Sequence, residues 1–315
     1  MKLQTLLRGG PKPVWLRYLL IIGFFFLVTR LILDSSFKHS ALLYVLVPYC
    51  VAIVIYIFMP QPQGRYRWQR FARHMFSAMI VMLATSALLF EGFLCVLMFM
   101  PIYIIFAIIG FAFAPKEYPT KNTADVFRVS FVPIAIVVLS LEGLNASLSL
   151  EREHSLTRTQ IVSLSPEQIH QNLSQPIHLN AQRSAFLSLF PLPTHVEAGS
   201  LNTGDIHKAH FKYKRWGLDG FNVKTGETWL KLASVTPLHI QTEVVKDTSY
   251  FSHYLTIHGT DIKLKPLDAK RTEISLTIHY RRELDPAWYF GPLQKSALTE
   301  SGDYLIQHVI ARGAS

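Results

Sequence analysis

The sequence predicts two regions with different folds: an α-helical transmembrane bundle over residues 1–144 and an α+β domain over 154–315, joined by a linker at 145–153. Three observations predict this division. Long apolar stretches run up to Leu141, whereas apolar and polar residues alternate from Asn145 onward, as in water-soluble strands. Basic residues outnumber acidic ones thirteen to five in the first region and are nearly balanced in the second. The mean hydropathy of +0.25 therefore averages two unlike halves.

The charge pattern excludes one broad class of function. The formal net charge of +10 belongs mostly to the first region, because the linker and the second region together have eighteen basic and sixteen acidic residues. A nucleic-acid-binding protein would need a basic face on its soluble domain, so we expect no nucleic-acid partner. Both cysteines, Cys50 and Cys95, lie in apolar stretches. No disulfide or cysteine-based zinc site is therefore expected in the second region.

Four apolar segments of the first region are candidates for membrane spans, each of which needs roughly 20 helical residues. They cover 14–33, 41–59, 75–90 and 93–114. The last two come from one apolar run of about twice the length of a single crossing, which Glu91-Gly92 divides. No small-residue cleavage site follows the first segment, so we interpret it as a span rather than a signal peptide.

A fifth segment, 129–141, is shorter and contains Pro133. Counting it as a span places eleven Lys and Arg on one side of the membrane and two, Arg30 and Lys38, on the other. Because basic residues gather at the cytoplasmic ends of spans, we expect the amino terminus in the cytoplasm of a bacterium. If 129–141 crosses the inner membrane, the second region lies in the periplasm. The side of the membrane on which the second region lies therefore depends on this segment.

A Glu-Gly step occurs at two expected span ends, as Glu91-Gly92 and Glu142-Gly143. Carboxylates in a membrane are costly and point to function by default, although the cost is modest at a wet interface. One interpretation is a pair of solvated carboxylates that mark span ends, with glycine allowing the turn. The other is a docking or portal site at the membrane interface, formed by Glu91, Glu142 and Arg30 and facing the second region.

The second region is expected to begin with one strand and two short helices. Residues 154–162 have strand character. The stretch 165–168 reads Ser-Pro-Glu-Gln, which predicts a helix start with a capping box and proline at the first helical position. Ile169 and Leu173 then form one apolar stripe. A second short helix is expected at 183–190, where two prolines end it.

A run of strands and a closing helix are expected to follow. Five stretches have alternating or β-branched character, namely 206–213, 227–233, 238–245, 254–264 and 272–281. Asp219-Gly220 and Thr225-Gly226 are expected as turns. The clearest strand is the last, in which one face carries Ile274, Leu276, Ile278 and Tyr280. A helix from about Leu293 to Ala311 closes the chain.

Several short stretches, in this order, suggest a known superfamily. They are the first strand with Ser165-Pro166-Glu167, Gly204-Asp205 before a strand, His258-Gly259 before Thr260 to Leu264, Thr272 to Tyr280, and Trp288-Tyr289-Phe290-Gly291-Pro292 before the last helix. In pattern and order they resemble the START-like, or SRPBCC, superfamily, which includes polyketide cyclases and the birch-pollen-allergen fold. The resemblance covers roughly residues 155–312.

The resemblance implies a helix-grip fold, in which a curved antiparallel sheet wraps around a long C-terminal helix. It also implies an apolar cavity that binds lipids, sterols, polyketides or other hydrophobic molecules. The candidate ligand-binding residues are Tyr280, Trp288, Tyr289 and Leu305. For the aromatic residues at the foot of the last helix, core packing and a cavity-mouth or membrane-facing position both stay open.

No catalytic residue, cofactor or metal is expected. The catalytic residues of enzymatic relatives vary between subfamilies, and the sequence contains no glycine-rich phosphate loop, nucleophile elbow or zinc-hydrolase signature. There are thirteen histidines, but their spacing argues against a metal site. His207 and His210, for example, are three apart on an expected strand and therefore point to opposite faces.

These observations together predict a membrane-anchored domain that binds a lipid or another hydrophobic small molecule without catalysis. Two alternatives stay open. A cyclase- or hydrolase-like enzyme acting on an apolar substrate would have a close His-carboxylate or Tyr-carboxylate pair in its cavity. A structural or assembly partner in the inner membrane would have its cavity filled by side chains.

Overall fold

A computed structural model describes residues 146–179, 183–190, 192–214 and 223–313, together with 141–143 and a few positions between 68 and 108. The chain divides into two compact units, and the second, which includes Leu150–Ser315, contains most of the described residues. Apart from those few positions and Leu141, the five expected spans lie outside the described residues. No helix in the described part of the chain is both long enough and apolar enough to cross a membrane.

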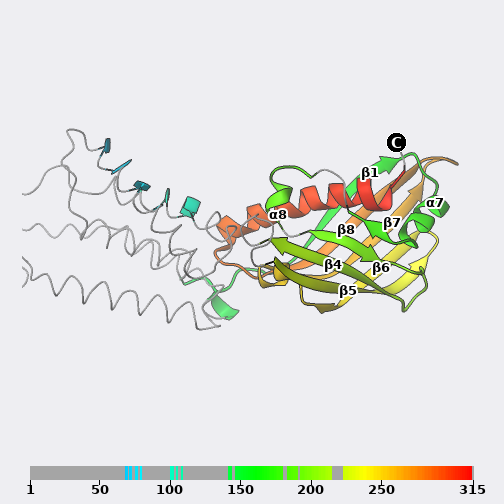
Figure 1. Cartoon of the computed structure of the whole chain (residues 1–315), viewed down its shortest axis with the longest axis horizontal. Coiled ribbons are helices and arrows are strands. Elements are labelled where there is room, and N and C mark those ends of the chain that lie inside the picture. Colours follow the sequence, from blue (N-terminus) through cyan, green and yellow to red (C-terminus); the bar gives the residue numbers. More distant parts are fainter. Residues whose placement is uncertain are drawn as a thin grey trace, which may run out of the picture. The chain divides into compact units, whose positions relative to one another are not determined.

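The second unit is built on one antiparallel sheet of eight strands, in the order β1-β8-β7-β6-β5-β4-β3-β2 (Figure 1). The strands are β1 Glu153–Val162, β2 Ile177–His178, β3 Pro193–Glu197, β4 Ile206–Lys214, β5 Val223–Thr236, β6 His239–Asp247, β7 Leu255–Pro266 and β8 Thr272–Arg282. The first strand therefore pairs with the last, and β2 forms the opposite edge.

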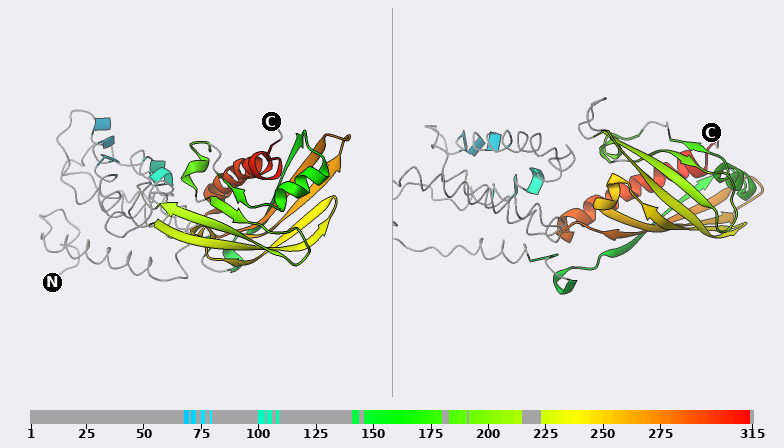
Figure 2. Two further views of the ribbon diagram at one scale, coloured as in Figure 1. Left: turned by 45° about the vertical axis from the view of Figure 1, so that its right-hand side comes forward. Right: turned by 60° about the horizontal axis from the view of Figure 1, so that its bottom comes forward.

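One long helix lies along the inside of this curved sheet. The α-helices are α7 Pro166–Leu173 and α8 Ala287–Leu305, which continues into the π-helix η5 Ile306–Ile310. Short 3-10 helices are η2 Ala146–Leu148, η3 Leu187–Leu189 and η4 Tyr250–His253. Two further views show the strands bending around α8 (Figure 2). This arrangement fits the helix-grip fold that the sequence predicted for the second region.

Bulges and two close backbone approaches accompany the bending of the sheet. Register shifts interrupt the pairing within β3, β5 and β7, and such bulges increase local twist. Gly259 lies at the shift in β7, where an added Cβ would come 2.1 Å from the Thr242 carbonyl oxygen. At Gly226 an added Cβ would come 2.5 Å from the Thr248 carbonyl oxygen. Only glycine fits at these two positions without moving the backbone.

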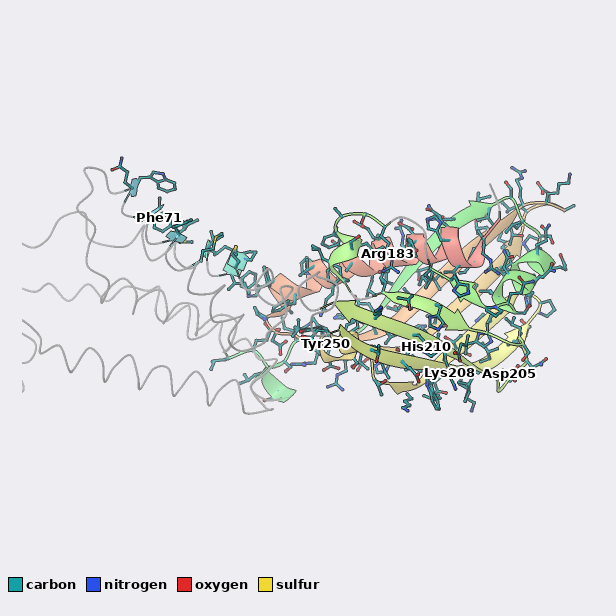
Figure 3. All side chains as sticks on the ribbon, viewed as in Figure 1. Phe71, Arg183, Asp205, Lys208, His210 and Tyr250 are labelled. Atoms are coloured by element: carbon teal, nitrogen blue, oxygen red, sulfur yellow. The ribbon has the colours of Figure 1, made fainter. Side chains whose placement is uncertain are left out.

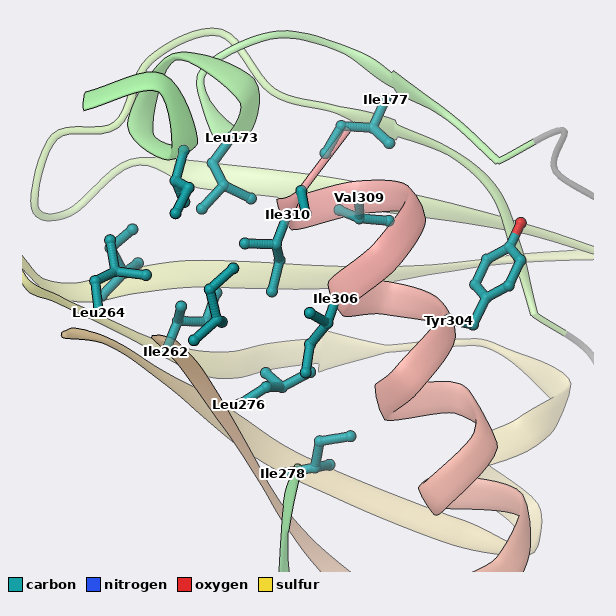
Figure 4. Close-up of a cluster of buried hydrophobic side chains, with 14 of the residues drawn as sticks. Leu173, Ile177, Ile262, Leu264, Leu276, Ile278, Tyr304, Ile306, Val309 and Ile310 are labelled. Carbon is teal, nitrogen blue, oxygen red and sulfur yellow. The ribbon is translucent and has the colours of Figure 1, made fainter. Parts of the chain in front are cut away.

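The apolar core lies between the sheet and the helices. The expected face of β8 is confirmed, because all four of its side chains are buried and belong to the core. Apolar side chains from α7, the strands and η5 point into the same space (Figure 4). We call the face of the sheet that these residues occupy the inner face, and the opposite face the outer face. On the inner face the described core is mostly aliphatic.

Most of the expected elements are present, and the differences have local causes. The capping box is confirmed, since the Ser165 backbone N–H donates to Gln168 Oε1 at 2.9 Å and the Gln168 N–H to Ser165 Oγ at 3.4 Å. The expected turn at Thr225-Gly226 is wrong, because both residues lie within β5. There Gly226 serves a close backbone approach instead of a turn. Asp219-Gly220 lies outside the described residues.

The expected helix at 183–190 is also wrong. Only Leu187–Leu189 form a 3-10 helix. The hydroxyl of Ser184 accepts a hydrogen bond from the Leu187 N–H at 3.0 Å, and the Ser184 carbonyl accepts one from Ser188 Oγ at 2.8 Å. Serine side chains and backbone that bond locally in this way compete with a continuous helix. The last helix begins earlier than predicted, at Ala287, with Pro292 inside it.

Candidate functional site

The side chains between the inner face and α8 differ in polarity from one end of the helix to the other. Toward the carboxyl end, the core is closed by aliphatic side chains from α7, the strands and η5, with Ile306 and Ile310 almost fully buried (Figure 4). Toward the amino end, buried polar groups accompany the aromatic residues. This end is therefore where the domain offers both apolar contact and hydrogen bonding.

Gln294 is the central polar residue at the amino end of α8. Its side chain is buried, with 7% of its surface exposed. Its Nε2 donates to the Tyr254 carbonyl oxygen at 2.9 Å, whereas its buried Oε1 accepts no hydrogen bond. Buried polar atoms in native proteins are nearly always paired. An unpaired carbonyl oxygen at this position is thus a candidate ligand contact.

Several aromatic residues lie at this end of the domain, on α8 and at η4. Tyr254 donates its hydroxyl proton to the Tyr250 hydroxyl oxygen at 2.8 Å, and the two rings meet edge to face. On α8, Tyr289 lies between the rings of Trp288 and Phe290, with centroids 5.9 and 4.9 Å away. Burial raises the pKa of the Tyr289 hydroxyl above its ordinary value. The hydroxyl of Tyr289 is therefore neutral at physiological pH.

The four predicted ligand-binding residues fall into two groups. Tyr280 is buried in the core, and Leu305 packs against that core from α8. Burial raises the pKa of the Tyr280 hydroxyl, and the charge of Arg282 offsets part of this rise. Trp288 and Tyr289 lie instead at the foot of α8, where the Trp288 side chain is 43% exposed. Of the predicted interface residues, Glu142 lies in a turn with Gly143 at φ 84°, and Glu91 and Arg30 lie outside the described residues.

A salt bridge fixes the far part of α8 to β1. Arg158 donates from Nε and Nη2 to the two carboxylate oxygens of Asp303, at 2.8 and 2.9 Å. Gln160 Nε2 donates to the same carboxylate at 3.0 Å. Hydrogen bonding to Asp303 and its charge raise the pKa of Arg158. The neighbouring Gly302 leaves room for this contact, because a Cβ there would come 2.9 Å from Arg158 Cγ.

A second ion-pair cluster is buried at the junction of β8 and α8. Asp285 is fully buried and accepts hydrogen bonds from Arg282 and Arg152. Arg282 is also almost fully buried, and its backbone N–H donates to the Arg152 carbonyl oxygen at 2.8 Å. The cluster joins the segment that enters the domain to the start of its last helix. We interpret it as structural, because the Asp285 carboxylate bridges the two guanidinium groups.

The close His-carboxylate pairs of the described residues lie on the outer face. Asp261 accepts from His279 and His239, at 2.7 and 3.0 Å, and it alternates along β7 with the buried Ile262. His258 lies 3.0 Å from Glu153, and both side chains are largely exposed. These pairs therefore face away from the space beside α8.

Sequence reasoning missed one further cluster on the outer face. The prediction that His207 and His210 point to opposite faces is confirmed, since His207 is buried and contacts the Ser200 carbonyl oxygen at 2.7 Å. His210, however, lies beside His195 and Glu197 of the neighbouring strand β3. The potential metal-ligand atoms of the three side chains lie within 4.8 Å of one another. The spacing along one strand could not reveal this cluster, because β3 itself was not predicted. The alternation His-Val-Glu over 195–197 was the available signal.

Comparisons with known proteins find similarity only at the level of structure. No protein-family model and no curated protein matches the sequence. A START superfamily protein from Mycobacterium smegmatis is similar over 50% of this chain and 96% of its own, with 15% identity and a TM-score of 0.33. The Zhui aromatase/cyclase from Streptomyces sp. R1128 is similar over 51% and 95%, with 11% identity and a TM-score of 0.31. Ginseng major latex-like protein 151 from Panax ginseng is similar over 50% and 99%, with 9% identity and a TM-score of 0.28.

Proposed function

We propose that the C-terminal domain binds a lipid or another hydrophobic small molecule between the sheet and the amino end of α8. The observation that carries this proposal is the buried, unpaired Oε1 of Gln294, one helical turn beyond the buried Phe290 on α8. A buried acceptor that lacks a donor costs about 1–3 kcal/mol. A ligand with an apolar body and one hydroxyl or amide donor would remove this cost. The ligand class is therefore an apolar molecule with a single hydrogen-bond donor near one end.

The proposed binding is non-catalytic. A cyclase- or hydrolase-like enzyme needs an acid or base within hydrogen-bond reach of its substrate. The close His-carboxylate pairs of the described residues are on the outer face, away from Gln294. On the inner face, Arg158 and Asp303 neutralise each other through two hydrogen bonds. This distribution favours a binding domain over the enzyme alternative.

We also propose that the chain is anchored in a bacterial inner membrane, with a cytoplasmic amino terminus and a periplasmic domain. The five apolar segments and the distribution of eleven basic residues against two support this arrangement. A tethered site meets molecules dissolved in the adjacent bilayer at a high effective concentration. Fusions of alkaline phosphatase and of a cytoplasmic reporter after Ser315 test it. Active phosphatase is expected, and activity of the cytoplasmic reporter alone would contradict the periplasmic placement.

Native mass spectrometry of the full chain tests the binding proposal. The chain is purified in detergent, and bound molecules are identified before and after incubation with phospholipid or fatty alcohol. We expect a bound apolar molecule on the wild-type chain. We expect Gln294→Leu to weaken binding of a ligand with a donor group by about threefold to tenfold, because one hydrogen bond is lost.

A matched control lies on the same terminal helix. Gln307 in η5 is exposed, so Gln307→Leu makes the same chemical change away from the proposed site. Its ligand occupancy should equal that of the wild type. A chain that is purified without any bound molecule and takes up none when lipid is added would rule the proposal out. Equal weakening by both variants would show that Gln294 does not contact the ligand.

A further inference from the structure

Four residues with metal-binding or acidic side chains form a row across the outer face. His178 on β2 is the register partner of His195 on β3, which is the partner of His210 on β4. His210 is in turn the partner of Glu227 on β5. His210 and Glu227 alternate with the buried Ala209 and Thr228, so the row faces outward. Directly opposite side chains on neighbouring strands lie close together.

His210, which is labelled in Figure 3, is at the centre of this row. Acidic groups flank both of its ring nitrogens. Its Nε2 lies 3.1 Å from Glu197 Oε1, and its Nδ1 lies 3.5 Å from Glu227 Oε1. The His195 ring stacks on the His210 ring, with centroids 4.3 Å apart and planes 7° from parallel. The ligand atoms of His195, Glu197 and His210 all lie within 4.8 Å of one another.

His210 and Glu197 are close to each other but do not form a hydrogen bond. Nε2 of His210 is buried, and despite the short distance it makes no hydrogen bond to Glu197. At 3.1 Å the distance itself would allow a hydrogen bond, so the in-plane direction of Nε2 is not aimed at this oxygen, and a buried polar atom is left without a partner. An ion bound by both side chains would give this buried nitrogen a partner.

The surroundings hold both histidines in the form that binds metal. Glu227 faces Nδ1 of His210 and is itself held by Trp229, whose Nε1 donates to Glu227 Oε2 at 3.0 Å. A carboxylate beside one ring nitrogen, here 3.5 Å away, stabilises a proton on that nitrogen and leaves the other nitrogen free for a metal ion. Thr194 Oγ1 donates to the His210 carbonyl oxygen at 3.1 Å, so it can only accept from His195 Nδ1 at 3.3 Å. The lone pair of each Nε2 is then available.

We propose that His195, Glu197 and His210 bind a divalent transition-metal ion on the outer face, at the β3–β4 pair, with Zn²⁺ as the best fit. Two imidazoles and a carboxylate are a common set of zinc ligands. Zinc bonds of about 2.1 Å in a tetrahedron place ligand atoms about 3.4 Å apart. The Nε2–Oε1 distance of 3.1 Å is close to this value.

The parallel rings require one adjustment when the ion binds. Parallel imidazoles direct their lone pairs side by side, so the His195 ring must turn for the lone pairs to meet at one ion. Its side chain is only partly buried, which allows this rotation. The three protein ligands leave a fourth position for water, as in open zinc sites. The ion would link β3 to β4 next to the short edge strand β2.

Calorimetric titration with ZnCl₂ tests this site. The full chain is purified in detergent without a polyhistidine tag, treated with EDTA and dialysed before titration. We expect one saturable equivalent on the wild type, and its loss in His195→Ala and in His210→Ala. Glu227→Gln, which keeps all three ligands, should weaken binding about 10- to 100-fold.

The control variant is His258→Ala. His258 lies 3.0 Å from Glu153 on the same outer face but outside the row, so its removal should leave the zinc affinity unchanged. Circular dichroism reports whether each variant is folded, and His195→Asn replaces His195→Ala if the latter is not. Absence of saturable binding to the wild type would overturn the proposal. So would an equal affinity in the folded His195 and His258 variants.

Discussion

The two faces of the sheet carry opposite chemistry although the same strands build both. On β8 the inner face presents Ile274, Leu276 and Ile278, whereas the alternate residues Ser275, Thr277 and His279 face outward. The apolar inner side chains pack against α8 and η5. The outer side chains instead form ladders across strands, such as the bond between the Thr157 and Thr277 hydroxyls at 2.8 Å.

This difference shows how one sheet separates stability from polar recognition. Alternation along a strand sends every second side chain to the other face, so each strand contributes to both. Apolar burial on the inner face stabilises the domain. Histidines and carboxylates on the outer face gather across strands without entering that core. A substitution on one face should therefore have consequences that its neighbour on the other face does not share.

The cluster of Arg152, Arg282 and Asp285 is an exception to this separation, because its charges are buried. A substitution in it should lower the free energy of unfolding more than any other considered. Removing Asp285 leaves Arg282 buried without its carboxylate. Because an uncompensated buried charge is costly, we expect Asp285→Ala to lower the free energy of unfolding by about 3–5 kcal/mol. Asp268 offers a matched control, since it pairs with Arg271 at the same sequence separation but on the surface.

Chemical denaturation followed by tryptophan fluorescence compares the two variants. Asp268→Ala should change the free energy of unfolding by no more than about 0.5–1 kcal/mol, as is usual for an exposed ion pair. If both variants lost the same amount, the buried cluster would contribute no more than a surface contact.

The next largest loss of stability is expected from a substitution in the core, compared with one on the outer face of the same strand. Ile274 is fully buried on the inner face, so Ile274→Ala should cost about 2–5 kcal/mol through lost apolar contact and a cavity. Thr277→Ala on the outer face of the same strand should cost about 0.5 kcal/mol or less. Thermal unfolding of both variants measures the difference. A loss for Thr277→Ala as large as for Ile274→Ala would show that the two faces do not differ in this way.

The sequence predicted those parts of the fold that depend on local patterns. The alternation in 272–281 and the capping box at 165–168 are visible because their partners lie within a few residues. Gly226 was misread as a turn because the close approach that requires glycine is to Thr248, which directly follows the next strand. The two-residue β2 and the five-residue β3 are too short for a period to be recognised, since β2 depends on pairing with β3 and β3 on pairing with β4.

Site residues, too, could be predicted only where they are close together in the sequence. The aromatic foot of α8 was found because Trp288, Tyr289 and Phe290 are consecutive in the sequence. The role of Gln294 was not, since only the fold shows that its Oε1 is buried and unpaired. His195 and His210 are fifteen positions apart and meet only through strand register. Residues that converge across strands need the topology before they can be recognised.

The smallest expected loss of stability concerns Asp261 on the outer face, and unlike a loss on the inner face it should depend on pH. Burial alone would raise the pKa of Asp261, but hydrogen bonds from His279 and His239 outweigh it, so the pKa lies below its ordinary value. A pKa that is lower in the folded state stabilises the fold fully above the unfolded value of about 3.9. This stabilisation is lost as the pH falls through the folded value.

Unfolding of Asp261→Asn at a series of pH values tests this expectation. The variant should be less stable than the wild type at neutral pH, and the difference should fade as the pH falls below about 4. The loss caused by Ile274→Ala should persist over the same range, because no proton is involved in apolar burial. A deficit of Asp261→Asn that stayed constant down to low pH would point to lost packing. The loss of stability would then be independent of pH for substitutions on both faces.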